Sequence, residues 1–158
     1  MKCFITLTLT CLFTASYAQV YELVKAISSD DLNGVEIAIY KVATKEMVPP
    51  DGEPFEKLII QKELSIQEIR TLLKRASRRS SYNDSQALLS HWNVVIAFSN
   101  DKDKIIFSTI TGNISVTHNG STGYSHISDK FGQYLYRFLH DADLLKYMDE
   151  EDLAALRP

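Results

Sequence analysis

The sequence predicts an α+β domain: an antiparallel sheet of about four to five strands built from hairpins, with two main helices packed on one face. Two observations predict the sheet. Apolar runs flank a short charged turn at 101–103, and alternating runs flank Asn119-Gly120, a dipeptide that favours tight hairpin turns. A third observation predicts the helices, because apolar residues at helical spacing follow the capping residues Ser65 and Ser128.

The first half of the chain begins with a segment of ambiguous type. Residues 20–29 carry apolar side chains at helical spacing and predict a short helix, although a strand fits them nearly as well. Residues 35–42 then alternate between apolar and other side chains, and residues 57–64 resume this strand character. The intervening segment 49–54 is rich in proline, which is excluded from central strands and helix interiors. We therefore expect the two strands to pair across a long loop.

A helix is expected to begin at Ser65. Glu68 stands three residues further on, which is the spacing of a capping box, where each side chain satisfies the other residue's free backbone N–H. The following residues form an apolar face that consists of Ile66, Ile69, Leu72, Leu73 and Ala76. Residues 77–90 are polar and predict the longest irregular stretch of the chain.

The second half predicts two hairpins and a helix. Residues 93–100 and 104–111 form the first hairpin, and the strands on either side of Asn119-Gly120 form the second. The helix that Ser128 and Asp129 cap has a stripe suited to covering a sheet, formed by Phe131, Tyr134, Leu135, Phe138 and Leu139. After a break near Asp141, its continuation is indicated by Leu144, Leu145, Tyr147 and Met148.

Residues 1–18 have the pattern of a secretory signal peptide. Lys2 precedes an almost uncharged apolar run, and the small-x-small pattern that ends at Ala18 predicts cleavage before Gln19. Cys3 and Cys11 both lie in this leader, so the mature chain carries no thiol. A lipoprotein that begins at Cys11 is the alternative, but the apolar run continues past that residue. Small exported animal domains usually rely on disulfides, which a mature chain without thiols cannot form. We therefore expect a periplasmic or secreted bacterial protein.

Length and charge bound the classes of function. Residues 19–158 are enough for a single domain with a core of its own. The formal net charge is −3, and loss of Lys2 makes it one unit more negative, which argues against nucleic-acid binding by overall charge. No further apolar stretch approaches the roughly 20 residues of a membrane span, so we expect no stable membrane insertion. No motif indicates a cofactor.

Charged residues are segregated along the chain. A basic cluster at the end of the first capped helix consists of Arg70, Lys74, Arg75, Arg78 and Arg79. A solvated face that interacts with the helix dipole explains it without a partner, and an anion or acidic-protein docking patch is the alternative. An acidic tail from about residue 141 contains Asp141, Asp143, Asp149, Glu150, Glu151 and Asp152. We expect this tail to be frayed, the alternatives being contact with the basic helix or with a basic partner.

Candidate side chains for interfaces and catalysis are few. Tyr82 and Trp92 are candidate interface anchors, although burial is the simpler interpretation for Trp92. Metal-ligand spacing is absent from the four histidines, His91, His118, His126 and His140. A two-residue turn at Asn119-Gly120 would also place His118 and His126 on opposite faces of the sheet. Ser121 lacks the spacing of a nucleophile elbow, and Glu36 and Glu63 are the carboxylates to inspect for glycoside chemistry.

The run from Ala97 to Ile106 reads Ala-Phe-Ser-Asn-Asp-Lys-Asp-Lys-Ile-Ile. It resembles the hairpin of small exported bacterial proteins of uncharacterised function, in which a hydrophobic strand, a charged turn with lysine and a second strand lead to a pair of cysteines. The resemblance covers residues 93 to about 117, and Gly112 and Ser115 stand where those relatives carry cysteines. It therefore implies location and fold, without a thiol or metal role.

Taken together, these patterns favour a small exported binding module whose partner is another protein. Its size and its predicted location outside the cytoplasm match those of immunity proteins and enzyme inhibitors that neutralise a partner, which is an argument from analogy. The alternative is a hydrolase of envelope polymers whose carboxylates or histidines converge only in the fold. A pocket that unites His118, His126, Glu36 or Glu63 would favour the hydrolase.

Overall fold

The computed structural model of the chain describes residues 20–42, 56–83 and 92–156. The predicted leader and its predicted cleavage site, the proline-rich connection 49–54 and His91 lie outside these ranges. None of the helices in the described ranges is both long enough and apolar enough to cross a membrane.

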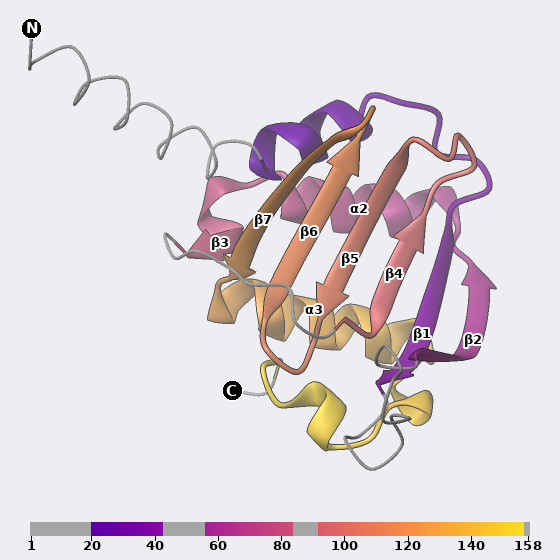
Figure 1. Ribbon diagram of the computed structural model, residues 1–158, viewed down its shortest axis with the longest axis vertical. Helices are drawn as coiled ribbons and strands as arrows, with labels where there is room; N and C mark the ends of the chain where they lie inside the picture. The colour runs from indigo at the N-terminus through magenta and orange to yellow at the C-terminus, as the bar shows by residue number, and fades with distance from the viewer. Residues whose placement is uncertain (1–19, 43–55, 84–91, 157–158) are drawn as a thin grey trace, which may run out of the picture.

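The fold is α+β with one antiparallel sheet, as predicted (Figure 1). Its strands are β1 (Glu36–Val42), β2 (Glu56–Glu63), β3 (Tyr82–Asn83), β4 (Val94–Ala97), β5 (Asp103–Ser108), β6 (Asn113–His118) and β7 (Ser121–Ile127). The order across the sheet is β2-β1-β4-β5-β6-β7-β3. The expected total of four to five strands is wrong, since the described residues already form a sheet of seven. Six of these strands correspond to segments that the sequence analysis identified individually. The seventh, β3, has only two residues, which is too few to show the alternation that identifies a strand.

In the described ranges, three α-helices accompany the sheet. The first helix covers residues 20–27, so the predicted helix in this segment is correct and the alternative of a strand is not. The other two helices are α2 (Ile66–Ala76) and α3 (Asp129–Asp141). Short 3-10 turns are η2 (Arg79–Ser81), η3 (Leu145–Tyr147) and η4 (Glu151–Leu153). The predicted loop 77–90 is thus wrong in its first part, which contains η2 and β3. After α3, the chain forms the turn η3 rather than a continued helix.

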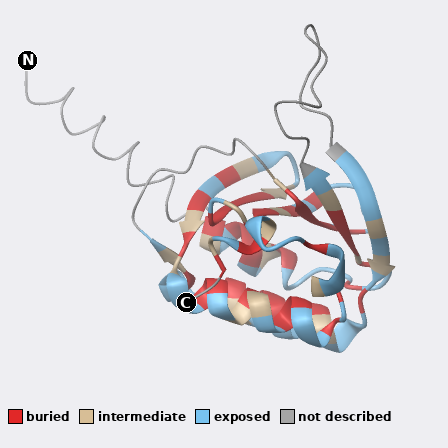
Figure 2. Cartoon of the chain, turned by 90° about the horizontal axis from the view of Figure 1, so that it is seen from below, coloured by how far each residue is buried: buried red, intermediate tan, exposed pale blue. Residues whose placement is uncertain are grey.

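All three helices pack on the same face of the sheet (Figures 1 and 2). Every second residue along the central strands is buried in the same hydrophobic core as the helices. These residues are Ile37, Ile39, Val94, Ile96, Ile105, Phe107, Ile114 and Val116. Gly123 in β7 lies so close to the first helix that a Cβ there would stand 3.0 Å from Val20 Cγ2. Because side chains alternate along a strand, the intervening residues face away from the helices.

Both predicted hairpins are confirmed. β4 pairs with β5, and β6 pairs with β7 so that His118 stands opposite Ser121. Asn119 (φ 48°) and Gly120 (φ 82°) form the turn between them, and positive φ at both central residues matches the twist of the flanking strands. The predicted pairing of β1 with β2 is also confirmed.

The acidic tail is ordered through residue 156, so the prediction of a frayed end is wrong. Its apolar residues are buried in the core, namely Leu144, Met148, Leu153 and Leu156. The Thr109 hydroxyl donates to the Asp152 carbonyl, and Ala155 N–H donates to the Thr109 carbonyl at 3.0 Å. The tail therefore packs against the end of the sheet near Thr109, and not against the basic helix α2.

The capping box of α2 is confirmed, and it gives a test of the fold. The Ser65 hydroxyl accepts from Glu68 N–H at 3.2 Å, and the Glu68 carboxylate accepts from Ser65 N–H at 2.8 Å. Replacing Ser65 by alanine should lower the free energy of unfolding by about 1 kcal/mol at neutral pH, the usual cost of losing an N-cap. Urea unfolding, followed by the fluorescence of Trp92, the single tryptophan, measures this change.

The same substitution should have a pH signature. Hydrogen bonds from Ser65 hold the pKa of the Glu68 carboxyl below its usual range. The resulting stability is present above the pKa of the unfolded chain and is lost as the pH falls through the folded value. The difference between the wild type and Ser65→Ala should therefore shrink in acid. Ser80→Ala is the control, because Ser80 is exposed and its hydroxyl makes no hydrogen bond to a described residue. Equal losses in both variants would contradict the capping argument.

Candidate functional site

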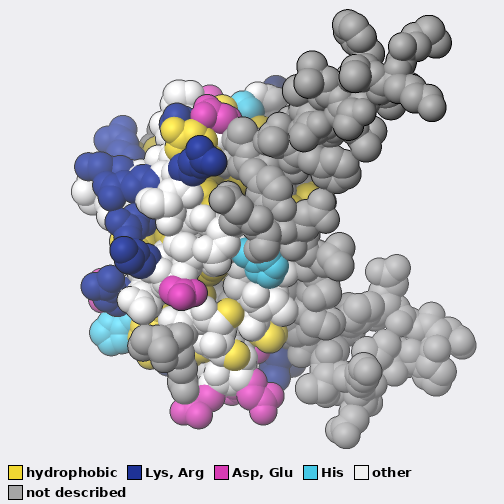
Figure 3. Space-filling model, turned by 90° about the vertical axis from the view of Figure 1, so that its left-hand side faces the viewer, with side chains coloured by type: hydrophobic (Ala, Val, Ile, Leu, Met, Phe, Trp, Pro, Cys, Tyr) yellow, Lys and Arg dark blue, Asp and Glu magenta, His cyan; other side chains and the backbone are white. Residues whose placement is uncertain are grey.

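The basic cluster predicted from the sequence forms one exposed surface on the helical side of the molecule (Figure 3). We call Arg70, Lys74, Arg75, Arg78 and Arg79 the basic surface. Four of these side chains are exposed and Arg75 is half-buried. None of the ion pairs formed within residues 20–42, 56–83 and 92–156 involves any of the five. The cations therefore carry charge that the described part of the fold leaves unbalanced.

Arg75 is fixed in place by α3. Its guanidinium carbon lies 5.8 Å from the centre of the Tyr134 ring, in cation–π geometry. Its Nε atom is buried and has no hydrogen-bond partner among the described residues. A buried donor without a partner costs free energy.

A groove of about 570 Å³ lies beside the basic surface, between α2 and α3. It is lined by Gln67, Glu68, Thr71, Tyr134, Arg137, Phe138, Asp141 and Ala142. α3 also contributes two exposed cations, Lys130 and Arg137, to the helical side. The groove thus adds the aromatic rings of Tyr134 and Phe138 next to the basic surface, and its own charged residues are Glu68, Arg137 and Asp141.

The two aromatic candidates do not join the basic surface as anchors. Tyr82 follows η2, but its ring packs on Phe131 and its hydroxyl donates to the Ala76 carbonyl at 2.5 Å. Burial raises the pKa of this hydroxyl. Trp92 is half-buried and contacts Tyr40 edge-to-face with ring centres 5.3 Å apart. Trp92 precedes β4. Three strands lie between β4 and β3, and the basic surface ends beside β3.

The residues singled out for catalysis do not converge. His118 lies on the helix-covered face and His126 on the opposite face, as the confirmed register of β6 and β7 requires. Glu36 and Glu63 stand directly opposite one another across β1 and β2, and Glu36 accepts a hydrogen bond from Gln61. His140 is exposed on α3, where its Nδ1 atom lies 3.1 Å from Asp141.

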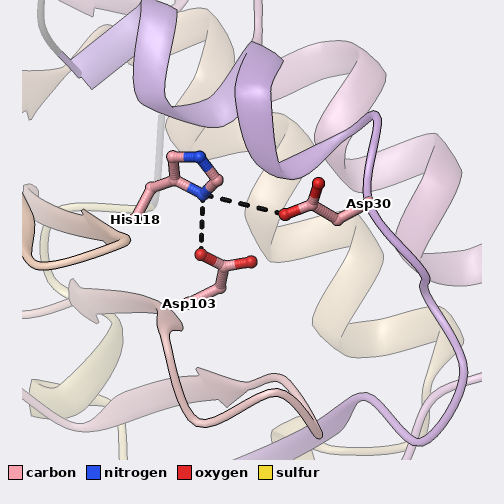
Figure 4. A group of neighbouring side chains, drawn as sticks. All are labelled: Asp30, Asp103 and His118. Atoms are coloured by element: carbon pink, nitrogen blue, oxygen red, sulfur yellow. Dashed lines mark hydrogen bonds and ion pairs between the residues drawn. The ribbon is translucent and has the colours of Figure 1, made fainter.

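The structure shows a polar cluster that sequence reasoning missed, formed by Asp30, Asp103 and His118 (Figure 4). His118 Nδ1 lies 2.7 Å from Asp103 Oδ1 and 3.8 Å from Asp30 Oδ2. On the other side of the ring, Asn119 Nδ2 lies 2.9 Å from Nε2. With the amide donating to Nε2, the imidazole proton stands on Nδ1, which donates to Asp103.

Asp103 is the buried member of this cluster, with only 3% of its surface exposed. Asn100 Nδ2 donates to Asp103 Oδ2 at 2.7 Å, and Asp103 N–H donates back to Asn100 Oδ1 at 3.1 Å. Burial acts to raise the pKa of the Asp103 carboxyl, but its side-chain hydrogen bonds with Asn100, His118 and Asp30 outweigh it and hold that pKa below its usual range. The fold therefore keeps an ionised carboxylate out of water at the end of the sheet.

One part of the cluster carries a readable signal in the sequence. Asp103 is the last residue of the predicted charged turn, directly before a predicted strand, and His118 ends another predicted strand. In the structure β5 starts at Asp103 and pairs with β6, which places the two residues opposite each other. Asp30 carries no such signal, because it joins them only through the packing of the first helix on the sheet.

Comparisons with protein-family models, with curated proteins and with solved structures found no match.

The role of Asn100 gives a test of the cluster. Asn100→Asp keeps the acceptor for the backbone N–H but replaces the donor to Asp103 with a second carboxylate. At neutral pH this change should lower the free energy of unfolding by about 1–3 kcal/mol, because a buried charge loses its hydrogen bond and meets a like charge. Thermal and urea unfolding measure the loss.

Asn33→Asp is a matched control for that substitution. Asn33 Nδ2 also donates to an aspartate, Asp31, at 2.6 Å, but this pair is exposed. Because water screens exposed charges, the control should change the stability far less. Equal effects of the two substitutions would show that burial of Asp103 contributes nothing to the role of Asn100.

Proposed function

We propose that this chain is an exported, non-catalytic binding module that neutralises a partner protein, as immunity proteins and enzyme inhibitors do. The supporting observation is the basic surface, whose five cations form no ion pair within the described residues. Charge that the fold leaves unbalanced is available to a partner, and arginines make bidentate contacts with carboxylates. The partner's contact region is therefore acidic.

Arg75 is the expected centre of this contact. Its stacking on Tyr134 fixes the guanidinium before a partner arrives, so little conformational entropy is lost on binding. The adjacent groove offers the rings of Tyr134 and Phe138 to an apolar residue of the partner. Cations around an aromatic centre are the composition in which interface hot spots are enriched.

The hydrolase of envelope polymers is the weaker alternative. It needs carboxylates or histidines that converge in one pocket, whereas Glu36 and His126 lie on the face opposite His118. Of the pair formed by Asp103 and His118, only His118 belongs to the residues on which the alternative relied, and its partner is none of the others.

Charge reversal tests the proposal. The tagged mature chain should capture an acidic partner from envelope extract, and Arg75→Glu with Arg79→Glu should reduce that capture at least about tenfold, since attraction becomes repulsion. Because Arg75 packs on Tyr134, a second variant, Lys74→Glu with Arg78→Glu, repeats the test with exposed side chains only. Capture by the wild type should also weaken as salt shortens the range of the interaction. Quantitative mass spectrometry of the captured partner measures each effect.

The matched control is Lys57→Glu with Lys104→Glu. These lysines are exposed on β2 and β5 rather than on α2 or η2, and they form no ion pair with a described residue. The control changes the net charge by the same amount and should leave capture unchanged. Equal loss in the control and in the basic-surface variants would contradict the proposal, because only net charge would then matter.

A further inference from the structure

The cluster of Asp30, Asp103 and His118 brings three metal-ligating side chains together from distant parts of the chain. Asp30 follows the first helix, Asp103 begins β5 and His118 ends β6. One ligand atom from each residue lies within 4.8 Å of the other two (Figure 4). The three side chains point toward a common centre at the end of the sheet.

The distances are close to those that a bound ion requires. Zinc bonds of about 2.0–2.2 Å in tetrahedral geometry place neighbouring ligand atoms roughly 3.4 Å apart. The two distances from His118 Nδ1, 2.7 Å to Asp103 and 3.8 Å to Asp30, lie on either side of this value. Changes of about 0.4–0.7 Å, which side-chain rotation supplies, would bring these two distances to that value.

The charge of the cluster also points to a cation. Two carboxylates face one imidazole, and neither carboxylate forms an ion pair with a lysine or arginine of the described ranges. Even a protonated His118 would balance only one of the two negative charges. Asp103 is fixed at its second oxygen by Asn100, which is the kind of outer contact that orients metal ligands. Asp30 is partly exposed, which gives an ion a route to the cluster.

We propose that Asp30, Asp103 and His118 form a binding site for a divalent zinc ion. Two carboxylate oxygens and one imidazole nitrogen suit zinc with water at the fourth position. Calcium requires six to eight oxygen ligands, and magnesium requires near-octahedral oxygen coordination, so this donor set disfavours both. The site is separate from the basic surface, which lies on the outer side of α2.

Zinc binding requires a change of tautomer at His118. Nδ1 must give up its proton to coordinate the ion, and the neutral ring then carries its proton on Nε2. Rotation of the Asn119 amide would place its oxygen beside Nε2, where the oxygen accepts this proton's hydrogen bond. Zinc should therefore convert His118 from the Nδ1–H to the Nε2–H tautomer.

The test uses the full chain, freed of metal with EDTA and titrated with zinc chloride. Calorimetry should show one zinc ion bound by His118 and the two aspartates, and ¹⁵N NMR should show the tautomer change at His118. Asp30→Asn, a substitution at a partly exposed residue that should not prevent folding, should weaken zinc binding at least about tenfold. His118→Gln should abolish binding to this site. Magnesium and calcium chloride should bind much more weakly than zinc.

The matched control is His140→Gln. His140 and Asp141 are also in contact, at 3.1 Å, but both are exposed and the structure places no third ligand beside them in the described ranges. This variant should bind zinc with wild-type affinity. Undiminished affinity in Asp30→Asn, or an unchanged His118 tautomer in the presence of zinc, would overturn the proposal. Tighter binding of calcium or magnesium would overturn the assignment to zinc.

Discussion

The constraint on which this structure depends is that helices cover only one face of the sheet. Alternate residues of β1, β4, β5 and β6 enter the core under the three helices, and this burial is the main source of stability. The arrangement also places the polar features. The outer side of α2 is left to carry the basic surface, and the end of the first helix brings Asp30 to the strand ends where Asp103 and His118 stand.

The parts of the fold that the sequence predicts are those that local interactions determine. The capping box at Ser65, the turn at Asn119-Gly120 and the cap at Ser128 each involve residues within a few positions of one another, and all three are confirmed. The features that the sequence did not predict depend on distant contacts. β3 exists because Tyr82 and Asn83 pair with the end of β7, and the acidic tail is ordered because Thr109 bonds to residues far along the chain.

The same distinction separates the two candidate sites. The basic surface can be recognised from the sequence because helical spacing alone gathers cations from one short segment. The cluster of Asp30, Asp103 and His118 cannot, since it needs the register of β5 with β6 and the packing of a helix on β7. The individual properties of His118 gave no indication of it, because histidine spacing reports only ligands on the same element. A site assembled from single residues of three elements is visible only in the fold.

The ordered tail changes the meaning of the charge segregation. A frayed acidic tail could reach the basic helix and neutralise it within the chain. Instead, buried leucines fix the tail at the end of the sheet near Thr109, and its acids meet lysines there: Asp149 pairs with Lys41, and Asp143 with Lys146. Among the described residues, no acid is left in contact with the basic surface. Because burial of these leucines holds the tail away from α2, the positive charge there stays exposed and is available to an acidic partner.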